Sequence, residues 1–139
     1  MIDYIVFFGL LLLALLAFIF RPKHEQELSP AAAQRAKCES PIERRLFDAL
    51  TARGYDVNAQ VKCGPYCIDL ALIAYKIAIE CDGREFHSSP EAKKRDRRKD
   101  AYLRKNGWIV LRFTGKQINK ELPKVLGRIE KELYKYRGE

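Results

Sequence analysis

Two short apolar segments of this 139-residue chain carry acidic residues at a spacing that predicts a metal site. Residues 67–73 and 76–82 are separated by only two residues, which is typical of a β-hairpin. A turn centred between residues 74 and 75 places Asp69 opposite Glu80, with Asp82 further along the same face. Clustered carboxylates repel one another, and a hard cation such as Mg²⁺ or Mn²⁺ offsets that repulsion. The alternative is an exposed polar sheet face with screened charges.

The alternation of side chains supports this register. It places six apolar side chains on the opposite face of the hairpin: Ile68, Leu70, Leu72, Ile77, Ile79 and Cys81. A shift by one residue would mix apolar and charged side chains on both faces, so the pattern favours the register given above. Ala74 and Tyr75 suit a tight two-residue turn poorly, and a longer turn is the alternative.

Three other polar residues are candidates for the same site. Glu43 follows Ser40-Pro41 at the start of a predicted helix, where a capping box would also explain it. Gln60 lies near the end of a predicted strand, where a solvent-exposed position is the alternative. His87 lies five residues after Asp82 and is a candidate proton donor, although single histidines are often structural.

A strongly basic helix follows this segment. The chain has a net charge of +8, and basic residues are dense over residues 91–105. A positive helix beside clustered acids suits a polyanionic substrate whose phosphates it neutralises. The candidate nucleic-acid-binding residues are Lys93, Lys94, Arg97, Arg98 and Arg104. The alternatives are a solvated, charge-rich helix and an ion pair through Asp96 and Arg97 that fixes the helix to the sheet.

The order of predicted elements indicates an α/β domain with the order α-β-β-β-α-β-α. A helix connects the third and fourth strands, so we expect these two strands to pair in parallel within a mixed sheet flanked by helices. The remaining expected elements are a helix from Ser40 to Gly54, strands over residues 55–63 and 108–113, and helices over residues 89–107 and 123–136. Trp108 is expected in the core.

The N-terminal segment is nearly free of charge. Residues 4–20 are apolar and would extend about 25 Å as a helix, which predicts a transmembrane anchor in the lipid bilayer over residues 1–20. The alternative interpretation is a signal peptide, but a signal peptide begins with positive residues, whereas this segment begins with Asp3. Basic residues follow the segment, so the N-terminus is expected outside and the domain on the cytoplasmic side of the inner membrane. Residues 21–37 are expected to be a polar tether and residues 38–139 the domain.

Four cysteines raise the alternative of a zinc-bearing module. They are Cys38, Cys63, Cys67 and Cys81. In the expected register Cys67 and Cys81 point to opposite faces of the sheet, so we expect no zinc site.

Several strings together resemble a known family. SPIERRLFDAL, CIDLALIAYKIAIECDGREFH and RDRRKDAYLRKNGWIVLRF are similar to the very-short-patch-repair endonuclease-like (Vsr-like) branch of the PD-(D/E)XK nuclease superfamily. The resemblance covers about residues 38–130. It implies a restriction-endonuclease-like core and metal-dependent cleavage of DNA phosphodiester bonds.

The resemblance also implies roles for individual residues. Asp69 matches the strand aspartate of the superfamily, and Glu80 matches the metal-binding acid of the next strand. Glu43 matches the helical glutamate, Gln60 matches a polar residue near the site, and the carbonyl of Cys81 matches a further ligand. The predicted catalytic set is made up of Asp69, Glu80, Asp82, His87, Glu43 and Gln60, and the metal is expected to be held by Asp69, Glu80 and Asp82.

One departure from the family pattern leaves the general base unassigned. Asp82 stands where the superfamily usually has a lysine. The sequence nonetheless predicts a membrane-anchored, Mg²⁺-dependent endonuclease acting on DNA, expected to be duplex. The alternative is a nuclease fold that binds nucleic acid, or another partner, without cutting.

Overall fold

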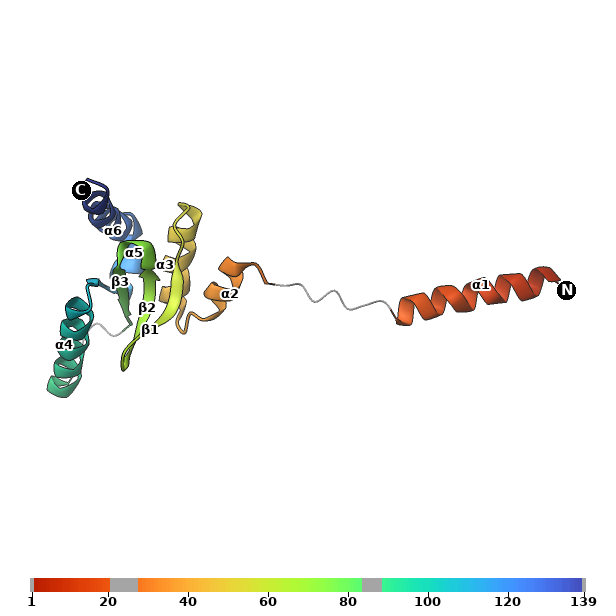
Figure 1. Ribbon diagram of the computed structural model, residues 1–139, viewed down its shortest axis with the longest axis horizontal. Coiled ribbons are helices and arrows are strands. Elements are labelled where there is room, and N and C mark those ends of the chain that lie inside the picture. Colours follow the sequence, from red (N-terminus) through yellow and green to blue (C-terminus); the bar gives the residue numbers. More distant parts are fainter. Residues whose placement is uncertain (1, 21–27, 84–88, 139) are drawn as a thin grey trace.

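The chain forms an N-terminal helix and a mixed α/β domain. The computed structural model describes residues 2–20, 28–83 and 89–138. Its elements are α1 (Ile2–Ile19), α2 (Pro30–Ala36), α3 (Pro41–Ala52), β1 (Asn58–Cys63), β2 (Tyr66–Leu72), η1 (Ile73–Tyr75), β3 (Ile77–Asp82), α4 (Pro90–Lys105), β4 (Ile109–Thr114), α5 (Gly115–Lys120) and α6 (Leu122–Arg137). Figure 1 shows α1 apart from the domain, with the sheet between α3 and α4.

The sheet has the mixed pairing that the sequence predicts. Its strand order is β1-β2-β3-β4, antiparallel except for the parallel pair β3–β4. The register of β2 and β3 runs from Leu70 opposite Ile79 to Leu72 opposite Ile77, which confirms the predicted hairpin. The turn is a short 3₁₀ helix followed by Lys76, whose φ of 52° is left-handed. The longer turn that was the alternative to a two-residue turn is therefore the one present.

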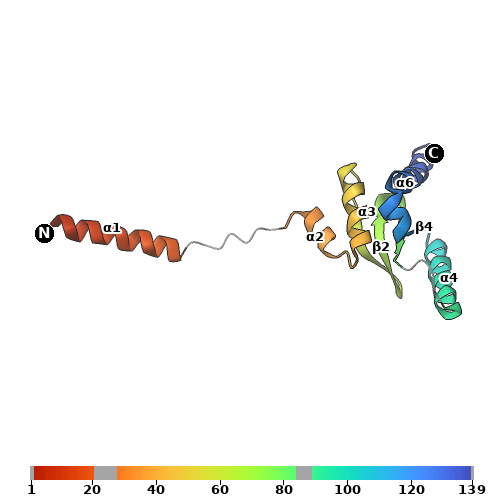
Figure 2. The same ribbon diagram turned by 180° about the vertical axis from the view of Figure 1, so that it is seen from behind.

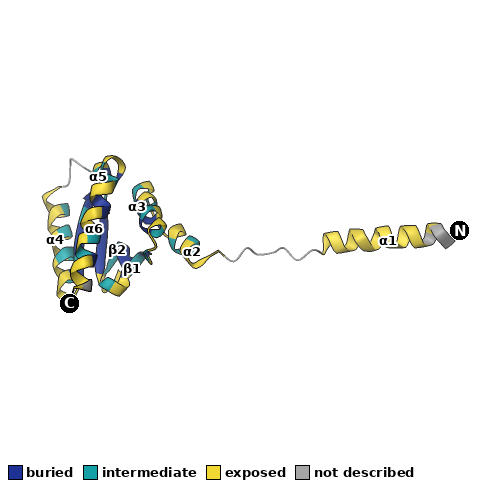
Figure 3. Ribbon diagram, turned by 90° about the horizontal axis from the view of Figure 1, so that it is seen from above, coloured by how far each residue is buried: buried dark blue, intermediate teal, exposed yellow. Residues whose placement is uncertain are grey.

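Each face of the sheet is covered by helices. On one, here called the α6 face, strand residues such as Leu70 and Ile79 pack with α3, α5 and α6. On the other, the α4 face, Ala71 and Ala78 pack with Leu103 of α4 and with Trp108, which is buried as predicted. Figure 2 shows α3 and α4 on opposite sides of the strands. Burial therefore follows the strands through the middle of the domain (Figure 3).

The alternation of side chains breaks in the middle of β1 and β2. Ala59 belongs to the α6 face, but Val61 packs on the α4 face, and Gln60 between them has a φ of 54°. In β2, Ile68 likewise lies on the α4 face while Leu70 lies on the α6 face, so the expectation that Ile68 shares a face with Leu70 is wrong. Gln60, which lies opposite Asp69, has a left-handed backbone conformation that interrupts the regular alternation of the two strands. A prediction from strict alternation does not include such an interruption.

Helix starts follow the predicted capping residues. Ser40 accepts a hydrogen bond from Glu43 N at 3.2 Å, and Ser89 accepts one from Ala92 N at 3.2 Å. Pro41 and Pro90 follow these caps in the first helical turn, where the missing N–H of proline has no helical partner to lose.

Two short helices were not in the predicted order. α5 begins at a capping box in which Thr114 Oγ1 accepts from Gln117 N at 3.2 Å and Gln117 Oε1 accepts from Thr114 N at 2.9 Å. α2 lies within the expected tether, and Gln34 Oε1 accepts from Ala59 N at 3.2 Å. These side-chain contacts stabilise helices that are too short to show an apolar period.

Helix α1 has its apolar side chains exposed (Figure 3). It is 18 residues long, which at 1.5 Å per residue is about 27 Å, against roughly 30 Å for a bilayer core. Within the described ranges, no helix is both long enough and apolar enough to cross a membrane, so the structure does not support the predicted transmembrane anchor over residues 4–20.

Candidate active site

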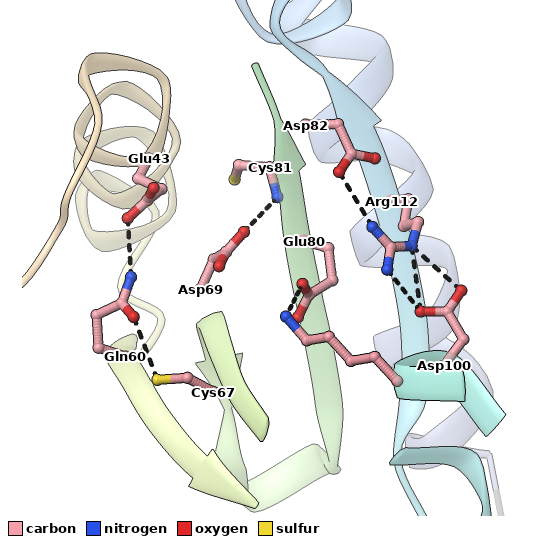
Figure 4. Close-up of polar contacts among 10 residues, drawn as sticks. Glu43, Gln60, Cys67, Asp69, Glu80, Cys81, Asp82, Asp100 and Arg112 are labelled. Carbon is pink, nitrogen blue, oxygen red and sulfur yellow. Dashed lines mark hydrogen bonds and ion pairs between the residues drawn. The ribbon is translucent and has the colours of Figure 1, made fainter. Parts of the chain in front are cut away.

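Two facing carboxylates lie where the β2–β3 pairing stops. The paired residues end at Leu70 and Ile79, so Asp69 and Glu80 are the next residues on each strand. Asp69 Oδ2 accepts a hydrogen bond from the backbone N–H of Cys81 at 2.8 Å, in place of a backbone partner (Figure 4). We call Asp69 and Glu80 the acid pair. The predicted juxtaposition is present, and a backbone donor fixes one of its members.

Glu80 is a buried charge with an incomplete set of partners. Its residue exposure is 3%, and with Glu43 it is one of two charged residues that are buried in the described chain. Its Oε2 accepts from Lys99 Nζ, whereas its Oε1 is buried and has no hydrogen-bond partner among the described residues. Burying a carboxylate costs free energy unless its oxygens are paired, so Oε1 requires a further partner.

Burial raises the pKa values of both members of the acid pair. The pKa of Glu80 is raised from 4.5 to about 7, chiefly by burial and then by the charge of Asp69, while Lys99 opposes the shift. Burial also raises the pKa of Asp69, against the hydrogen bond from Cys81 N. A cation at this position favours the ionised forms of both carboxylates.

Glu43 and Gln60 form a second polar group beside the acid pair. Glu43 Oε2 accepts from Gln60 Nε2 at 3.1 Å and from Glu39 N at 2.9 Å, while its Oε1 accepts from Ser40 Oγ at 2.7 Å. Gln60 Oε1 in turn accepts from Cys67 Sγ at 3.2 Å. Figure 4 shows the Gln60 side chain between Glu43 and Cys67. The Ser40 cap is present, but the full capping box is not, because Glu43 accepts from the N–H of Glu39 and not from that of Ser40. Glu43 also reaches the site through Gln60.

Asp82 does not join the acid pair. It accepts from Arg112 Nη1 at 3.0 Å, and Arg112 Nη2 also donates to Asp100 Oδ1 of α4 at 2.8 Å. Figure 4 shows this group on the β4 side of Glu80, away from Asp69. The charge of Asp82 is thus neutralised by an arginine, and the predicted set of three metal-binding carboxylates is reduced to two.

The acid pair suits a hard divalent cation. Among residues 2–20, 28–83 and 89–138, no group of three His, Cys, Asp or Glu side chains is arranged to hold a metal ion. Mg²⁺ is usually held by only one or two carboxylates, with waters and substrate phosphates completing its shell. The acid pair offers two carboxylates, and the Oε1 oxygen of Glu80 is unpartnered, so the pair matches that pattern. Asp69 and Glu80 would therefore be the ligands of the cation. The four cysteines are free thiols.

Helix α4 presents basic side chains outward. The predicted nucleic-acid-binding residues on it are all exposed: Lys93, Lys94, Arg97, Arg98 and Arg104. Two ion pairs join α4 to the sheet, Lys99–Glu80 and Asp100–Arg112, and neither involves Asp96 or Arg97. His87 lies outside the described residues, so its role stays a prediction.

The sequence analysis did not single out three residues of this region. Lys99, Asp100 and Arg112 connect α4 with β3 and β4 through charge. The available signal was helical spacing, because Lys99 lies one turn before the buried Leu103 and therefore points to the same side. Because most positions of this helix are basic, residue type alone does not distinguish Lys99 from its exposed neighbours.

The site lies in a chain with recognisable relatives. An uncharacterized protein of Haemophilus influenzae is 28% identical over 94 residues, which cover 66% of this chain and 77% of the relative. The uncharacterized protein YcjD of Escherichia coli is 32% identical over 94 residues, covering 66% and 78%.

A solved structure and a family model agree on the fold. The catalytic domain of the homing endonuclease I-Bth0305I superposes with a TM-score of 0.59 at 24% identity, covering 70% of this chain and 97% of that domain. The REase_MTES_1575 family model matches residues 42–133. The match includes the acid pair, Gln60 and all of α4. The chain therefore belongs to the REase_MTES_1575 family and has a PD-(D/E)XK-like, restriction-endonuclease-like fold.

Proposed function

We propose that this chain is a divalent-metal-dependent endonuclease that hydrolyses phosphodiester bonds of DNA. The observation that carries the proposal is the state of Glu80 within a nuclease-like fold. It is a buried carboxylate with one oxygen unpartnered, and it faces the second carboxylate of the acid pair. Such an arrangement is costly for stability alone, so it favours a role in binding a cation.

The residues around the acid pair have separable tasks in this proposal. When bound, a divalent cation such as Mg²⁺ or Mn²⁺ activates water and neutralises the charge that builds on the phosphate. The N–H of Cys81 orients Asp69 toward that position. Exposed basic side chains of α4, Lys93 and Arg97 among them, bind the phosphates of duplex DNA and position the backbone.

Glu43 and Gln60 support the acid pair from the side of α3 and β1. Gln60 holds a left-handed φ of 54°, which costs free energy for a residue with a side chain. This conformation places its amide between Glu43 Oε2 and Cys67 Sγ. We therefore assign Gln60 and Glu43 a positioning role at the edge of the site.

The proposal is tested with the full chain, kept in solution by a mild detergent because α1 exposes apolar side chains. Supercoiled plasmid, linear duplex, single strands and RNA are incubated with Mg²⁺, Mn²⁺ or EDTA. We expect cutting of duplex DNA that requires the metal and is lost in Glu80→Gln, while binding of DNA persists. Cutting that continues in EDTA would contradict the proposal.

The same assay decides the second candidate function. Asp82 is bound by an arginine and stands where the resembled superfamily usually has a lysine, which favours a fold that binds nucleic acid without cutting. In that case wild type and Glu80→Gln would bind DNA equally with salt-sensitive affinity, and neither would cut in any metal. A binding module also has no use for an unpartnered carboxylate oxygen, which is why we place it second.

The location of the chain is a separate prediction. The sequence predicts that residues 4–20 hold it at the inner membrane with the domain on the cytoplasmic side. After cell fractionation, we expect the full chain in the membrane pellet at high salt and a chain without residues 1–20 in the supernatant. Recovery of the full chain in the supernatant would contradict this prediction.

A further inference from the structure

Lys99 differs from the other basic residues of α4 in the position of its side chain. All basic residues of α4 are described, and every one except Lys99 is exposed. The Lys99 side chain is 17% exposed, and its ammonium pairs with the Glu80 carboxylate, whose side chain is 4% exposed. Leu103, one helical turn later, is fully buried and directs this side of the helix toward the sheet.

The ion pair involves the same carboxylate that the proposed cation requires. Lys99 holds Glu80 Oε2 and leaves only Oε1 without a partner. Lys99 also acts electrostatically on Asp69, the other member of the acid pair. Because two positive charges repel at contact distance in a poorly solvated site, an ammonium and a divalent cation at Glu80 oppose each other.

A neighbouring contact keeps Lys99 near the site when its own ion pair opens. Asp100, the next residue of α4, accepts two hydrogen bonds from Arg112 Nε at 3.1 Å and one from Arg112 Nη2 at 2.8 Å. This bidentate contact joins α4 to β4 independently of Glu80. Lys99 can then change partner by side-chain rotation, while the helix stays in place.

On the basis of the function proposed above, we propose that Lys99 competes with the divalent cation for Glu80 and, when displaced, contacts a phosphate of the bound DNA. The lysine then serves two states of the site. Without metal it is the counter-ion of a buried carboxylate, and with metal and DNA it is a catalytic residue that adds positive charge at the phosphate.

The first part is tested by Mn²⁺ binding to the full chain without DNA, followed by electron paramagnetic resonance. Lys99→Gln keeps a hydrogen-bond donor for Glu80 but removes the charge, so we expect Mn²⁺ to bind about tenfold more tightly. Lys99→Arg keeps the charge and should bind Mn²⁺ about as wild type does. Glu80→Gln should lose most of the affinity, and the matched control Lys131→Gln, on exposed α6 surface, should leave it unchanged.

The second part is tested by single-turnover cleavage of duplex DNA at saturating Mn²⁺. Lys99→Gln should cut about 10- to 100-fold more slowly even though it binds the metal more tightly. A purely structural role cannot produce these opposite changes, since a damaged site would weaken both. Circular dichroism verifies folding, and Lys99→Met repeats both measurements if Lys99→Gln unfolds.

Unchanged or weaker Mn²⁺ binding by Lys99→Gln would overturn the competition, as would a wild-type chain that binds no Mn²⁺. Tighter binding with unchanged cleavage would overturn the phosphate contact. If the wild-type chain binds Mn²⁺ but cuts no nucleic acid, the proposed function fails, while the Mn²⁺ affinities still decide whether Lys99 competes for Glu80.

Discussion

Helices α4 and α6 have the same length and cover opposite faces of one sheet, yet they are held in different ways. Each has 16 residues. α6 buries a stripe of four apolar side chains against the α6 face: Val125, Leu126, Ile129 and Leu133. α4 buries only Leu103, and two ion pairs, Lys99–Glu80 and Asp100–Arg112, join it to the sheet. A Tyr102–Tyr66 ring contact and a hydrogen bond from Arg104 to the Val110 carbonyl add to this attachment.

The two helices therefore differ in what their contacts with the sheet contribute to stability and to the candidate site. Apolar burial, which dominates along α6, stabilises a fold without placing charge at the sheet. The two ion pairs of α4 depend on charge, and one of them involves the carboxylate that a metal would use. The helix that carries the basic surface is therefore the one whose attachment involves the candidate site.

The largest effects on the fold are expected from the fully buried apolar side chains of the two helices. Ile129→Ala removes a fully buried side chain from the α6 face and should lower the free energy of unfolding by about 3 kcal/mol. Urea unfolding measures this loss, and cleavage per folded molecule should stay near that of wild type. Leu103→Ala, the matched change in α4, should cost a similar amount but also slow cleavage, because Lys99 lies one turn away. Equal effects of both changes on cleavage would contradict the separation.

A smaller effect is expected from the second ion pair of α4. Arg112→Met removes the partner of both Asp82 and Asp100 and should lower the free energy of unfolding by about 1–2 kcal/mol. The matched control is Arg53→Met, which breaks a more exposed ion pair with Glu130 and should cost less than about 0.5 kcal/mol. Urea unfolding of both variants checks this order, and the reverse order would show that α4 does not depend on Arg112.

The acid pair predicts an unusual pH dependence of stability in EDTA. The pKa of Glu80 rises from 4.5 in the unfolded chain to about 7 in the fold, with Asp69, Lys99 and Arg112 as its charged neighbours. Between these values the folded state binds the extra proton, so the free energy of unfolding should fall as pH rises, by up to about 3 kcal/mol. Urea unfolding at several pH values measures this. Glu80→Gln should remove the contribution of Glu80 to this pH dependence. An unchanged pH dependence in this variant would show that another titratable group causes it.

The smallest effect on stability is expected on the outer surface of α4. Lys93→Gln with Lys94→Gln changes two exposed side chains, so the free energy of unfolding should change by less than about 0.5 kcal/mol. DNA binding should weaken, and its dependence on salt should fall by a slope of about 1 to 2. Fluorescence anisotropy at several salt concentrations measures this, with Lys131→Gln as the control on α6. Equal slopes for wild type and the double variant would exclude these lysines from the interface.

Much of the hairpin was predictable because alternation fixes which residues share a face. Leu70 opposite Ile79 agrees with that rule, and Asp69 and Glu80 are the next residues on the two strands. Ile68 escaped the rule because the pleat is interrupted opposite Gln60, and glutamine gives no sign of a left-handed conformation.

The contacts of individual charges were less predictable. The sequence shows that the helix over residues 90–105 is basic, but tertiary packing decides that Lys99 alone of its basic residues turns inward. Asp82 and Arg112 lie on the neighbouring strands β3 and β4, so their ion pair depends on the register of these strands. That register is set by the folded sheet and cannot be read from either strand alone. Short helices such as α5 were accessible through the capping box at Thr114 and Gln117.

The most direct test of the central claim compares two carboxamide substitutions in one cleavage assay. Asp69→Asn changes a carboxylate of the acid pair, and Asp56→Asn changes an exposed aspartate outside the site. Plasmid nicking in Mg²⁺ is followed by gel electrophoresis, with the folded fraction of each variant measured by circular dichroism. We expect Asp69→Asn to reduce the rate by about 1,000-fold or more, because several kcal/mol of metal-dependent stabilisation are lost, and Asp56→Asn to leave it unchanged. A folded Asp69→Asn chain that nicks DNA at the wild-type rate would contradict the assignment of this site.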